Sequence, residues 1–155
     1  MTATAPAYPR AAIPASLIEG LSALVGDRLT TSRAICEAHG RDESFHPAVA
    51  PDAVVFATST EEVAAVVRLC AAHKAPIIPF GVGTSLEGHI AAPHGGVTLN
   101  LGQMNRVIEV NGEDLDCRVE AGVTRKQLNA HLRDHGLFFP IDPGADATIG
   151  GMSAT

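Results

Sequence analysis

The stretch Pro79-Phe80-Gly81-Val82-Gly83-Thr84-Ser85-Leu86-Glu87-Gly88-His89 directly follows a short apolar run, Ile77-Ile78. The apolar run predicts a strand, so the stretch predicts a loop at the end of that strand. Its glycines allow positive backbone φ values and a close approach of backbone N–H groups to a ligand. Hydroxyl groups of Thr84 and Ser85 add donors. These features favour an anion-binding loop, and a plain glycine-rich turn between two strands is the alternative.

Two well-known nucleotide-binding loops do not match this stretch. Residues 81–86 lack the third glycine of the Rossmann fingerprint, and Pro93 with the Gly95-Gly96 pair leaves little room for the helix that would follow. Residues 83–88 have the GxxxxG spacing of a Walker loop, but His89 and Ile90 stand where Lys and Ser or Thr are required. Rossmann-type binding and ATP hydrolysis are therefore disfavoured.

The residues before the loop predict a β-α-β unit. Residues 53–57 are almost entirely apolar, as in a strand that is covered on both faces. Ser59 and Glu62 form a capping box, and apolar residues then recur at helical spacing until Pro76. Residues 77–80 form the second strand, which predicts a parallel pair joined by a crossover helix.

The remaining segments predict short helices and antiparallel strands. In chain order they are a disordered leader over residues 1–12, helices over 13–25 and 30–39, a surface loop over 40–51, a strand over 97–101, a hairpin over 107–110 and 115–119, and a helix from Thr124 to Gly136. The fold class is therefore α+β, with a small parallel β-α-β layer followed by antiparallel strands.

A second stretch of small and hydroxylated residues, 141–155, is predicted to form another glycine-rich loop. We expect the two loops to clamp an extended, phosphorylated ligand from opposite sides. Because the chain has a net charge of −6, its phosphates would be held by backbone N–H dipoles and hydroxyls and not by a cluster of Lys and Arg.

Composition excludes several classes of protein. The 155 residues are 46% hydrophobic and 18% charged, which indicates a folded domain and not a disordered chain. No apolar stretch approaches the ~20 residues of a membrane-spanning helix. The first residues lack the basic and then apolar pattern of a secretory signal, so a cytoplasmic location is expected. Lys and Arg number 11 against 17 for Asp and Glu, without a basic cluster, so nucleic acid is not expected as a partner.

Other titratable side chains are expected to be structural. Cys36, Cys70 and Cys117 are far apart, which argues against disulfides and zinc fingers. His131 and His135 have the i, i+4 spacing of a metal pair on a helix, but no third ligand is evident, so an exposed helix face is expected. Asp142 and Asp146 are an acid/base candidate pair, with turn capping as the favoured alternative. Cys70 is expected in the core.

Six stretches taken together carry a family resemblance: residues 39–44, 51–55, 79–89, 105–107, 120–124 and 139–155. Through them, residues 38–155 resemble the N-terminal FAD-binding domain of the flavin-dependent D-2-hydroxyacid dehydrogenases. This group includes FAD-linked D-lactate dehydrogenase and the FAD subunit of glycolate oxidase, and is related to vanillyl-alcohol oxidase and p-cresol methylhydroxylase (PCMH). The resemblance implies a PCMH-type fold and FAD as cofactor.

The resemblance also implies which residues hold FAD. The pyrophosphate would be wrapped by Pro79, Gly81, Val82, Gly83, Thr84, Ser85 and Leu86. The flavin and ribityl-phosphate side would be lined by Pro143, Gly144, Ala147, Thr148, Gly150 and Gly151. Some relatives attach FAD through a histidine that aligns with Thr84, so non-covalent FAD is implied here. Hydride would pass from a D-2-hydroxyacid such as lactate or glycolate to flavin N5, and electrons would leave to a cytochrome, a quinone or a partner subunit.

The same resemblance implies that the FAD-binding domain over residues 13–155 is incomplete at its C-terminus, because relatives continue into a separate substrate domain. No catalytic residue and no metal ligand is assigned in this chain. Alone it is expected to bind FAD weakly or not at all and to be inactive, and peripheral membrane association is an option for the parent enzyme. A non-catalytic FAD- or nucleotide-binding module and an inert truncation product are the alternatives.

Overall fold

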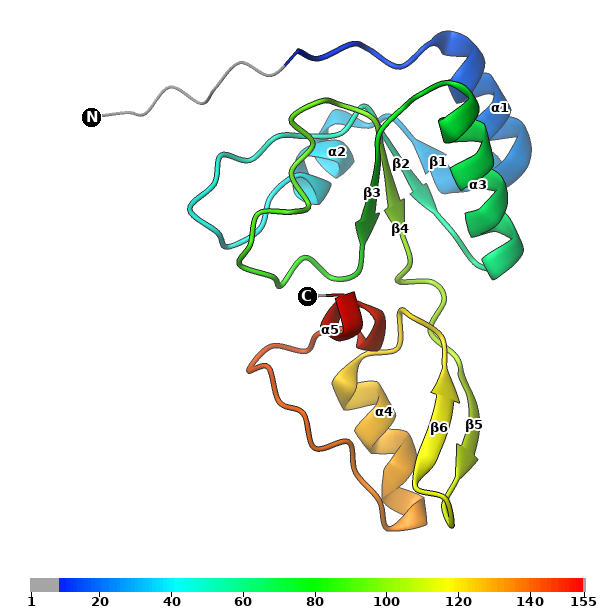
Figure 1. Cartoon of the computed structure of the whole chain (residues 1–155), viewed down its shortest axis with the longest axis vertical. Coiled ribbons are helices and arrows are strands. Elements are labelled where there is room, and N and C mark those ends of the chain that lie inside the picture. Colours follow the sequence, from blue (N-terminus) through cyan, green and yellow to red (C-terminus); the bar gives the residue numbers. More distant parts are fainter. Residues whose placement is uncertain (1–8, 155) are drawn as a thin grey trace.

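A computed structural model describes residues 9–154, so most of the predicted leader lies outside the described residues. The helical elements are α1 (Ala15–Val25), η1 (Gly26–Arg28), α2 (Arg33–His39), α3 (Thr60–Ala72), α4 (Arg125–Leu132), η2 (Arg133–His135) and α5 (Ile149–Ala154). The strands are β1 (Leu29–Thr30), β2 (Ala53–Phe56), β3 (Ile77–Phe80), β4 (Val97–Asn100), β5 (Val107–Asn111) and β6 (Asp116–Val119). Figure 1 shows the sheet of β1–β4 in the upper half and the β5–β6 hairpin in the lower half.

The upper sheet has the strand order β1-β2-β4-β3. The strands β2, β4 and β3 are parallel, and the two-residue strand β1, which was not predicted, pairs antiparallel with β2. The predicted β-α-β unit is present, but its two strands are not neighbours because β4 lies between them. Asn100 pairs with both Phe56 and Phe80. The carboxyl ends of all three parallel strands therefore lie side by side at one edge.

Helices α1 and α3 cover one face of this sheet (Figure 1). Leu17 and Leu21 of α1 and Val66 and Cys70 of α3 are fully buried in one cluster with β2 and β4. Burying side chains of this size contributes roughly 1.5–3 kcal/mol each. The predicted core position of Cys70 is confirmed. Residues that alternate with this cluster along the strands face α2 and the loops on the other side.

The lower half is a hairpin covered by α4. The predicted antiparallel pairing of β5 with β6 is confirmed, with an irregularity between Val107 and Glu109. Leu128 and Leu132 of α4 pack with Val123 into a separate apolar cluster beneath the hairpin. Gly136 ends this helical segment in the left-handed conformation, as predicted.

The prediction of a loop throughout residues 141–155 is wrong over Ile149–Ala154, which form α5. Two consecutive glycines lower helix propensity, which is why the sequence pattern favoured a loop. Hydrogen bonds to another segment stabilise the start of this helix. Ile149 N–H donates to Val123 O at 2.8 Å, and Gly150 N–H donates to Ala121 O at 2.9 Å. Thr148 Oγ1 accepts from Gly151 N–H at 3.1 Å. In Figure 1, α5 lies between the hairpin half and the carboxyl edge of the sheet.

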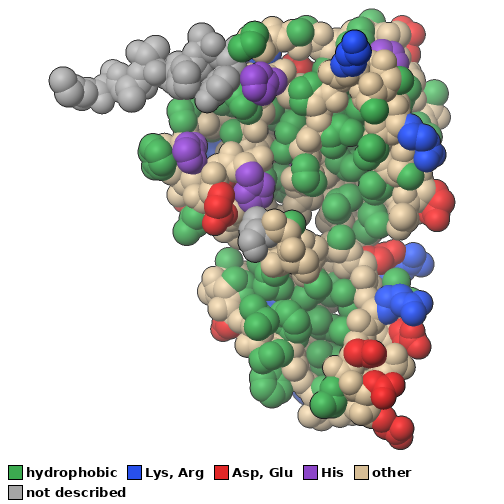
Figure 2. Space-filling model, viewed as in Figure 1, with side chains coloured by type: hydrophobic (Ala, Val, Ile, Leu, Met, Phe, Trp, Pro, Cys, Tyr) green, Lys and Arg blue, Asp and Glu red, His purple; other side chains and the backbone are tan. Residues whose placement is uncertain are grey.

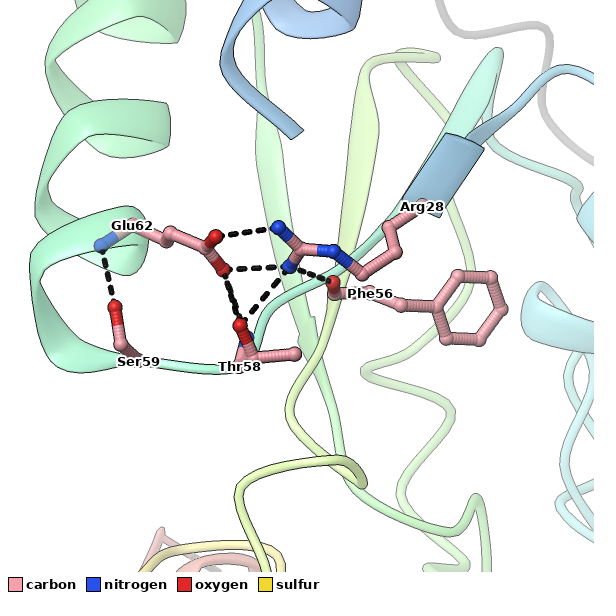
Figure 3. Close-up of polar contacts among 5 residues, drawn as sticks. All are labelled: Arg28, Phe56, Thr58, Ser59 and Glu62. Carbon is pink, nitrogen blue, oxygen red and sulfur yellow. Dashed lines mark hydrogen bonds and ion pairs between the residues drawn. The ribbon is translucent and has the colours of Figure 1, made fainter. Parts of the chain in front are cut away.

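The predicted capping boxes form only in part. Ser59 Oγ accepts from Glu62 N–H, and Thr124 Oγ1 accepts from Gln127 N–H, as predicted. The Glu62 side chain does not return to Ser59, however. Figure 3 shows it facing Arg28, which donates to both of its carboxylate oxygens, to Phe56 O and to Thr58 Oγ1.

This Arg28 clamp joins the end of α1–η1, the end of β2 and the start of α3. Glu62 also accepts from Thr58 N–H at 2.9 Å. The hydrogen bond from Arg28 is the main reason that the pKa of Glu62 falls to about 2, and the Thr58 hydrogen bonds act in the same direction. The folded chain therefore favours the Glu62 carboxylate more strongly than the unfolded chain does.

We predict that Glu62→Gln lowers the free energy of unfolding by about 2 kcal/mol at pH 7, because Arg28 loses its charged partner. A lowered folded-state pKa means that this stabilisation is fully present above pH 4.5 and is lost as the pH falls through about 2. Urea unfolding at pH 7 and pH 2.5 measures both effects, and the difference between variant and wild type should shrink at the lower pH. Glu61→Gln, at the exposed neighbouring position, is the matched control and should unfold like wild type.

Candidate functional site

The carboxyl edge of the parallel strands carries the candidate site. Residues 81–88, hereafter the glycine loop, leave this edge at the end of β3. In open parallel sheets, ligands bind outside the carboxyl ends of the strands. The expected positive φ values occur at Gly83 (71°) and Gly88 (73°) but not at Gly81. Gly81 is required for a different reason, which is a close contact.

Gly81 lies against Thr148. A Cβ atom at Gly81 would lie 2.5 Å from Thr148 Oγ1, and one at Gly151 would lie 2.9 Å from the same oxygen. Thr148 is only 2% exposed. The start of the glycine loop and the start of α5 therefore meet at one buried hydroxyl, and no side chain fits between them. This contact brings the two predicted loops together, although they are more than 60 residues apart in the chain.

Four consecutive backbone donors of the glycine loop are free. No hydrogen bond within residues 9–154 uses the N–H groups of residues 82–85, whereas the Leu86 N–H donates to the Glu87 carboxylate. No hydrogen bond within that range uses the N–H groups of residues 145–148 either. Backbone N–H groups that lack a protein partner are satisfied by water or by a ligand. Two runs of such donors meeting at Thr148 suit a ligand with several anionic oxygens.

The other predicted residues of the glycine loop face outward. Pro79 and Thr84 are exposed, as are Val82 (43%) and Leu86 (66%). The Ser85 hydroxyl, expected to serve a ligand, donates to the Glu87 carboxylate. That hydrogen bond is the main reason that the pKa of Glu87 lies below its usual value. A negative charge therefore stands beside the free donors.

The structure does not bring the whole second loop to the glycine loop. Ala147 and Gly150 lie close to the Thr148 contact, and Gly150 packs against Ala121. Pro143 and Gly144 are exposed, and a Cβ atom at Gly144 would meet nothing within 4 Å. The contact between the loops thus involves Thr148 and Gly151 but not residues 143–144.

Residues 40–51, which were predicted only as a surface loop, brace the glycine loop. Asp42 Oδ2 accepts from Gly88 N–H and Oδ1 accepts from Ser44 N–H, both at 3.0 Å. Burial by itself would raise the pKa of Asp42, but the hydrogen bonds from Ser44 and Gly88 outweigh it and lower that pKa. The Asp42-x-Ser44 spacing of an Asx-turn was a signal that sequence reasoning missed.

The two loops of the site lack cationic side chains. Residues 79–96 and 141–154 contain no Lys or Arg. Figure 2 shows acidic side chains gathered at the foot of the lower half, over the turn of the β5–β6 hairpin. The exposed acids there are Glu109, Glu113, Asp114 and Asp116. These four acids therefore lie at the far end from the free N–H groups, whereas the carboxylates of Glu87 and Asp42 lie beside the glycine loop.

Asp142 and Asp146 act as caps. Asp142 Oδ1 accepts from Gly144 N–H at 3.0 Å, and Asp146 Oδ1 accepts from Lys126 N–H at the start of α4. The prediction of a turn cap is confirmed for Asp142, whereas Asp146 caps the start of α4 and not a turn. The rings of His131 and His135 stack with centroids 6.2 Å apart. Within the described part of the chain, no three His, Cys, Asp or Glu side chains come together as a metal site would require.

Comparison with known proteins gives strong matches. Residues 51–155 match the family described as FAD binding domain. The chain is 49% identical over 140 residues to "Probable D-lactate dehydrogenase, mitochondrial" of Danio rerio, covering 90% of this chain and 28% of that protein. It is 46% identical over 145 residues to "D-lactate dehydrogenase [cytochrome], mitochondrial" of Arabidopsis thaliana (92% and 26%). It is 36% identical over 144 residues to D-2-hydroxyglutarate dehydrogenase of Stutzerimonas stutzeri (90% and 31%).

Among solved structures, the fold is similar to p-cresol methylhydroxylase with substrate bound. The TM-score is 0.70 at 28% identity, covering 79% of this chain and 25% of that chain. The expected PCMH-type α+β fold is confirmed. The chain spans between a quarter and a third of the length of the relatives named above.

We predict that Gly81→Ala destabilises the chain by about 1–3 kcal/mol, because the new methyl group displaces the buried Thr148 hydroxyl. Thr148→Ala removes the displaced oxygen, so the double variant should be more stable than the sum of the two single effects predicts. Chemical denaturation of the four proteins measures this coupling. Gly112→Ala, in the hairpin turn where a Cβ meets nothing within 4 Å, is the control. Strictly additive effects would contradict the assigned contact.

Proposed function

The chain belongs to the FAD binding domain family and its cofactor is FAD, and from these premises we propose that it holds FAD in a flavin-dependent D-2-hydroxyacid dehydrogenase. The resemblance seen in the sequence is thereby confirmed at the level of the family. The nature of the substrate, the electron acceptor and the roles of individual residues are part of the proposal.

The free N–H groups of residues 82–85 are the observation that carries this proposal. Pyrophosphate oxygens are strong acceptors, and an array of fixed backbone dipoles binds them without a cationic side chain. We assign the pyrophosphate to the glycine loop, with its contacts at Pro79, Gly81, Val82, Gly83, Thr84, Ser85 and Leu86. The close packing at Gly81 and Gly151 leaves no room for a side chain where the backbone would approach the cofactor.

The flavin side of FAD would run along the second loop. We assign Pro143, Gly144, Ala147, Thr148, Gly150 and Gly151 to this side. Thr84 offers no ring nitrogen for attachment, so FAD is held without a covalent bond. The residues of this chain bind and orient the cofactor and limit its access to water.

When bound, FAD supplies a two-electron acceptor for the hydride on the carbon that bears the substrate hydroxyl. The proposed substrate is a D-2-hydroxyacid such as D-lactate or glycolate, and the relatives named for D-lactate and D-2-hydroxyglutarate support this class of substrate. A relative named for its cytochrome supports a cytochrome as the electron acceptor, with a quinone as the other candidate.

We propose that residues 13–50 belong to the same domain as the matched residues 51–155. Leu17 and Leu21 share a core cluster with β2 and β4, and β1 pairs with β2.

No helix within residues 9–154 has the length and apolar character needed to cross a bilayer. The expected cytoplasmic location is not confirmed, since two relatives are named mitochondrial.

Titration of the purified chain with FAD tests the proposal. We expect FAD to bind, ADP to compete with it, and riboflavin to compete poorly, because riboflavin lacks the phosphates that the glycine loop would hold. Isothermal calorimetry with each ligand gives the three affinities. Equal competition by riboflavin and ADP would remove the pyrophosphate from the glycine loop. Failure of both this chain and the protein that the complete reading frame encodes to bind FAD would overturn the proposal.

Activity is measured on the protein that the complete reading frame encodes. Dye reduction with D-lactate, glycolate and D-2-hydroxyglutarate, each against its L enantiomer where one exists, identifies the substrate class. Reduction by a D-2-hydroxyacid supports the proposed reaction. Reduction by none of them assigns the FAD-binding chain to another reaction.

We predict that Glu87→Gln tightens FAD binding about twofold to fivefold, because it removes a negative charge beside the phosphates and releases the Ser85 hydroxyl. Calorimetric Kd values at low and high salt measure the change, which should be smaller at high salt. Glu113→Gln removes the same charge in the hairpin turn and should leave the Kd unchanged. Weaker binding by Glu87→Gln would show that the carboxylate supports the loop.

A further inference from the structure

Three consecutive hydrogen bonds connect α2 to the loop after β4, at the candidate site. His39 Nδ1 lies 2.8 Å from Ile35 O, one helical turn earlier. His39 Nε2 lies 2.9 Å from Asn100 Nδ2, at the carboxyl end of β4. Asn100 Oδ1 lies 2.8 Å from Gly102 N, in the loop after β4. The two ends of this series of hydrogen bonds are backbone groups.

The two backbone groups determine which atom carries the hydrogen in each of these three hydrogen bonds. Ile35 O can only accept, so His39 Nδ1 must carry a hydrogen. Gly102 N–H can only donate, so it must meet the oxygen of the Asn100 amide and not the nitrogen. The amide NH₂ of Asn100 therefore points at His39 Nε2, which must offer a lone pair. Only the neutral Nδ1–H form of His39 satisfies all three bonds.

His39 also supports the glycine loop through its ring. The ring centroid lies 4.4 Å from that of Phe80 and 5.6 Å from that of Phe56. Phe80 Cζ in turn lies 3.0 Å from the position of a Cβ atom at Gly83. On the side of Asn100, a Cβ atom at Gly102 would lie 3.9 Å from Gly81 O. The ring contact through Phe80 and the hydrogen bonds through Asn100 therefore both lead from His39 to residues 81–83, at the start of the glycine loop.

The side chains that contact the His39 ring carry no charge. Its ring and hydrogen-bond contacts with β2, β3 and β4 come from Phe56, Phe80 and Asn100, which are uncharged. No salt bridge within residues 9–154 includes His39. The charged groups on the adjoining segments are engaged elsewhere: Arg33 with Glu37 on α2, Arg28 with Glu62 at the end of β2, and Asp42 with Ser44 and Gly88 after α2.

We propose that neutral His39 is a positioning residue for the cofactor. Its protonation breaks one of the hydrogen bonds of Asn100 that support the start of the glycine loop. A proton on Nε2 would face the Asn100 NH₂, so one of the two donors must turn away. If the Asn100 amide rotates to accept from His39, its NH₂ faces Gly102 N–H and that bond is lost instead. This inference rests on the proposed binding of FAD by the glycine loop.

The expected consequence is a loss of FAD affinity on acidification. Loss of one such hydrogen bond corresponds to a threefold to tenfold weaker Kd, by about 0.5–1.5 kcal/mol. Measurements at about pH 8 and about pH 5.5 bracket the range in which histidine is the side chain whose charge ordinarily changes. Protonation of an exposed histidine beside the loop, such as His89, would attract phosphate and act in the opposite direction.

Calorimetric titration of the chain with FAD at pH 8 and pH 5.5 tests the inference in wild type and two variants. In Asn100→Asp, the carboxylate can accept from both Gly102 N–H and a protonated His39, so the ratio of the two Kd values should become flat. His73→Gln is the matched control, because His73 makes the same i−4 contact to Leu69 O but lies on α3 away from the site. It should keep the wild-type ratio.

Nitrogen-15 NMR of the free chain gives a readout that needs no FAD. We expect the Nδ1–H form of His39 at pH 8, and shifts of the Gly102 and Gly83 amide signals as His39 takes up its proton. These shifts should persist in His73→Gln and change in Asn100→Asp. An Nε2–H form of His39, or amide signals that do not follow its protonation, would overturn the inference.

The failures of the two proposals are distinguishable. If neither this chain nor the protein that the complete reading frame encodes binds FAD at pH 8 while His39 still controls the Gly102 amide, the proposed function fails and the structural coupling stands. If FAD binds with the same pH ratio in wild type and Asn100→Asp, the inference fails and the proposed function stands.

Discussion

The hydrogen bonding of β4 to β2 on one side and to β3 on the other is the constraint on which the site depends. It sets Phe56, Asn100 and Phe80 side by side. From this edge the chain leaves three times, into the corner held by the Arg28 clamp, into the loop after Asn100 and into the glycine loop. Because the strands are parallel, these exits share one edge, and segments far apart in the sequence can enclose a single ligand.

Backbone and not side-chain charge dominates this edge. The glycine loop presents free N–H groups, Thr148 closes against Gly81, and neither loop contains Lys or Arg. Fixed backbone dipoles hold an anion only if the backbone itself is held in place. The polar side chains around the edge serve that purpose: Asp42 holds Gly88, Asn100 holds Gly102, and Glu62 holds the corner after β2. Asp42 and Asn100 each accept from a backbone N–H group, and Glu62 accepts from Thr58 N–H and from the Arg28 guanidinium.

Sequence reasoning succeeded where one segment carries its own signal. The apolar run 53–57, the two short runs of the hairpin and the Ser59 and Thr124 caps each depend on neighbours within a few residues, and each is found in the structure. It failed where a distant partner decides. Ile149–Ala154 are helical because Val123 and Ala121 accept their N–H groups, and β1 is a strand only because β2 lies beside it. No local pattern holds that information.

The sequence by itself determined the family, the parallel layer with its glycine loop, and the absence of cationic side chains from both loops, because these follow from residue order and short-range chemistry. The tertiary structure alone decided that β4 separates β2 from β3, that Thr148 meets Gly81, and that His39 reaches Asn100. These contacts join residues 61 or more positions apart for the last two pairs. Such pairs meet only when packing of the sheet and its helices brings them together, and composition or periodicity carries no record of that packing.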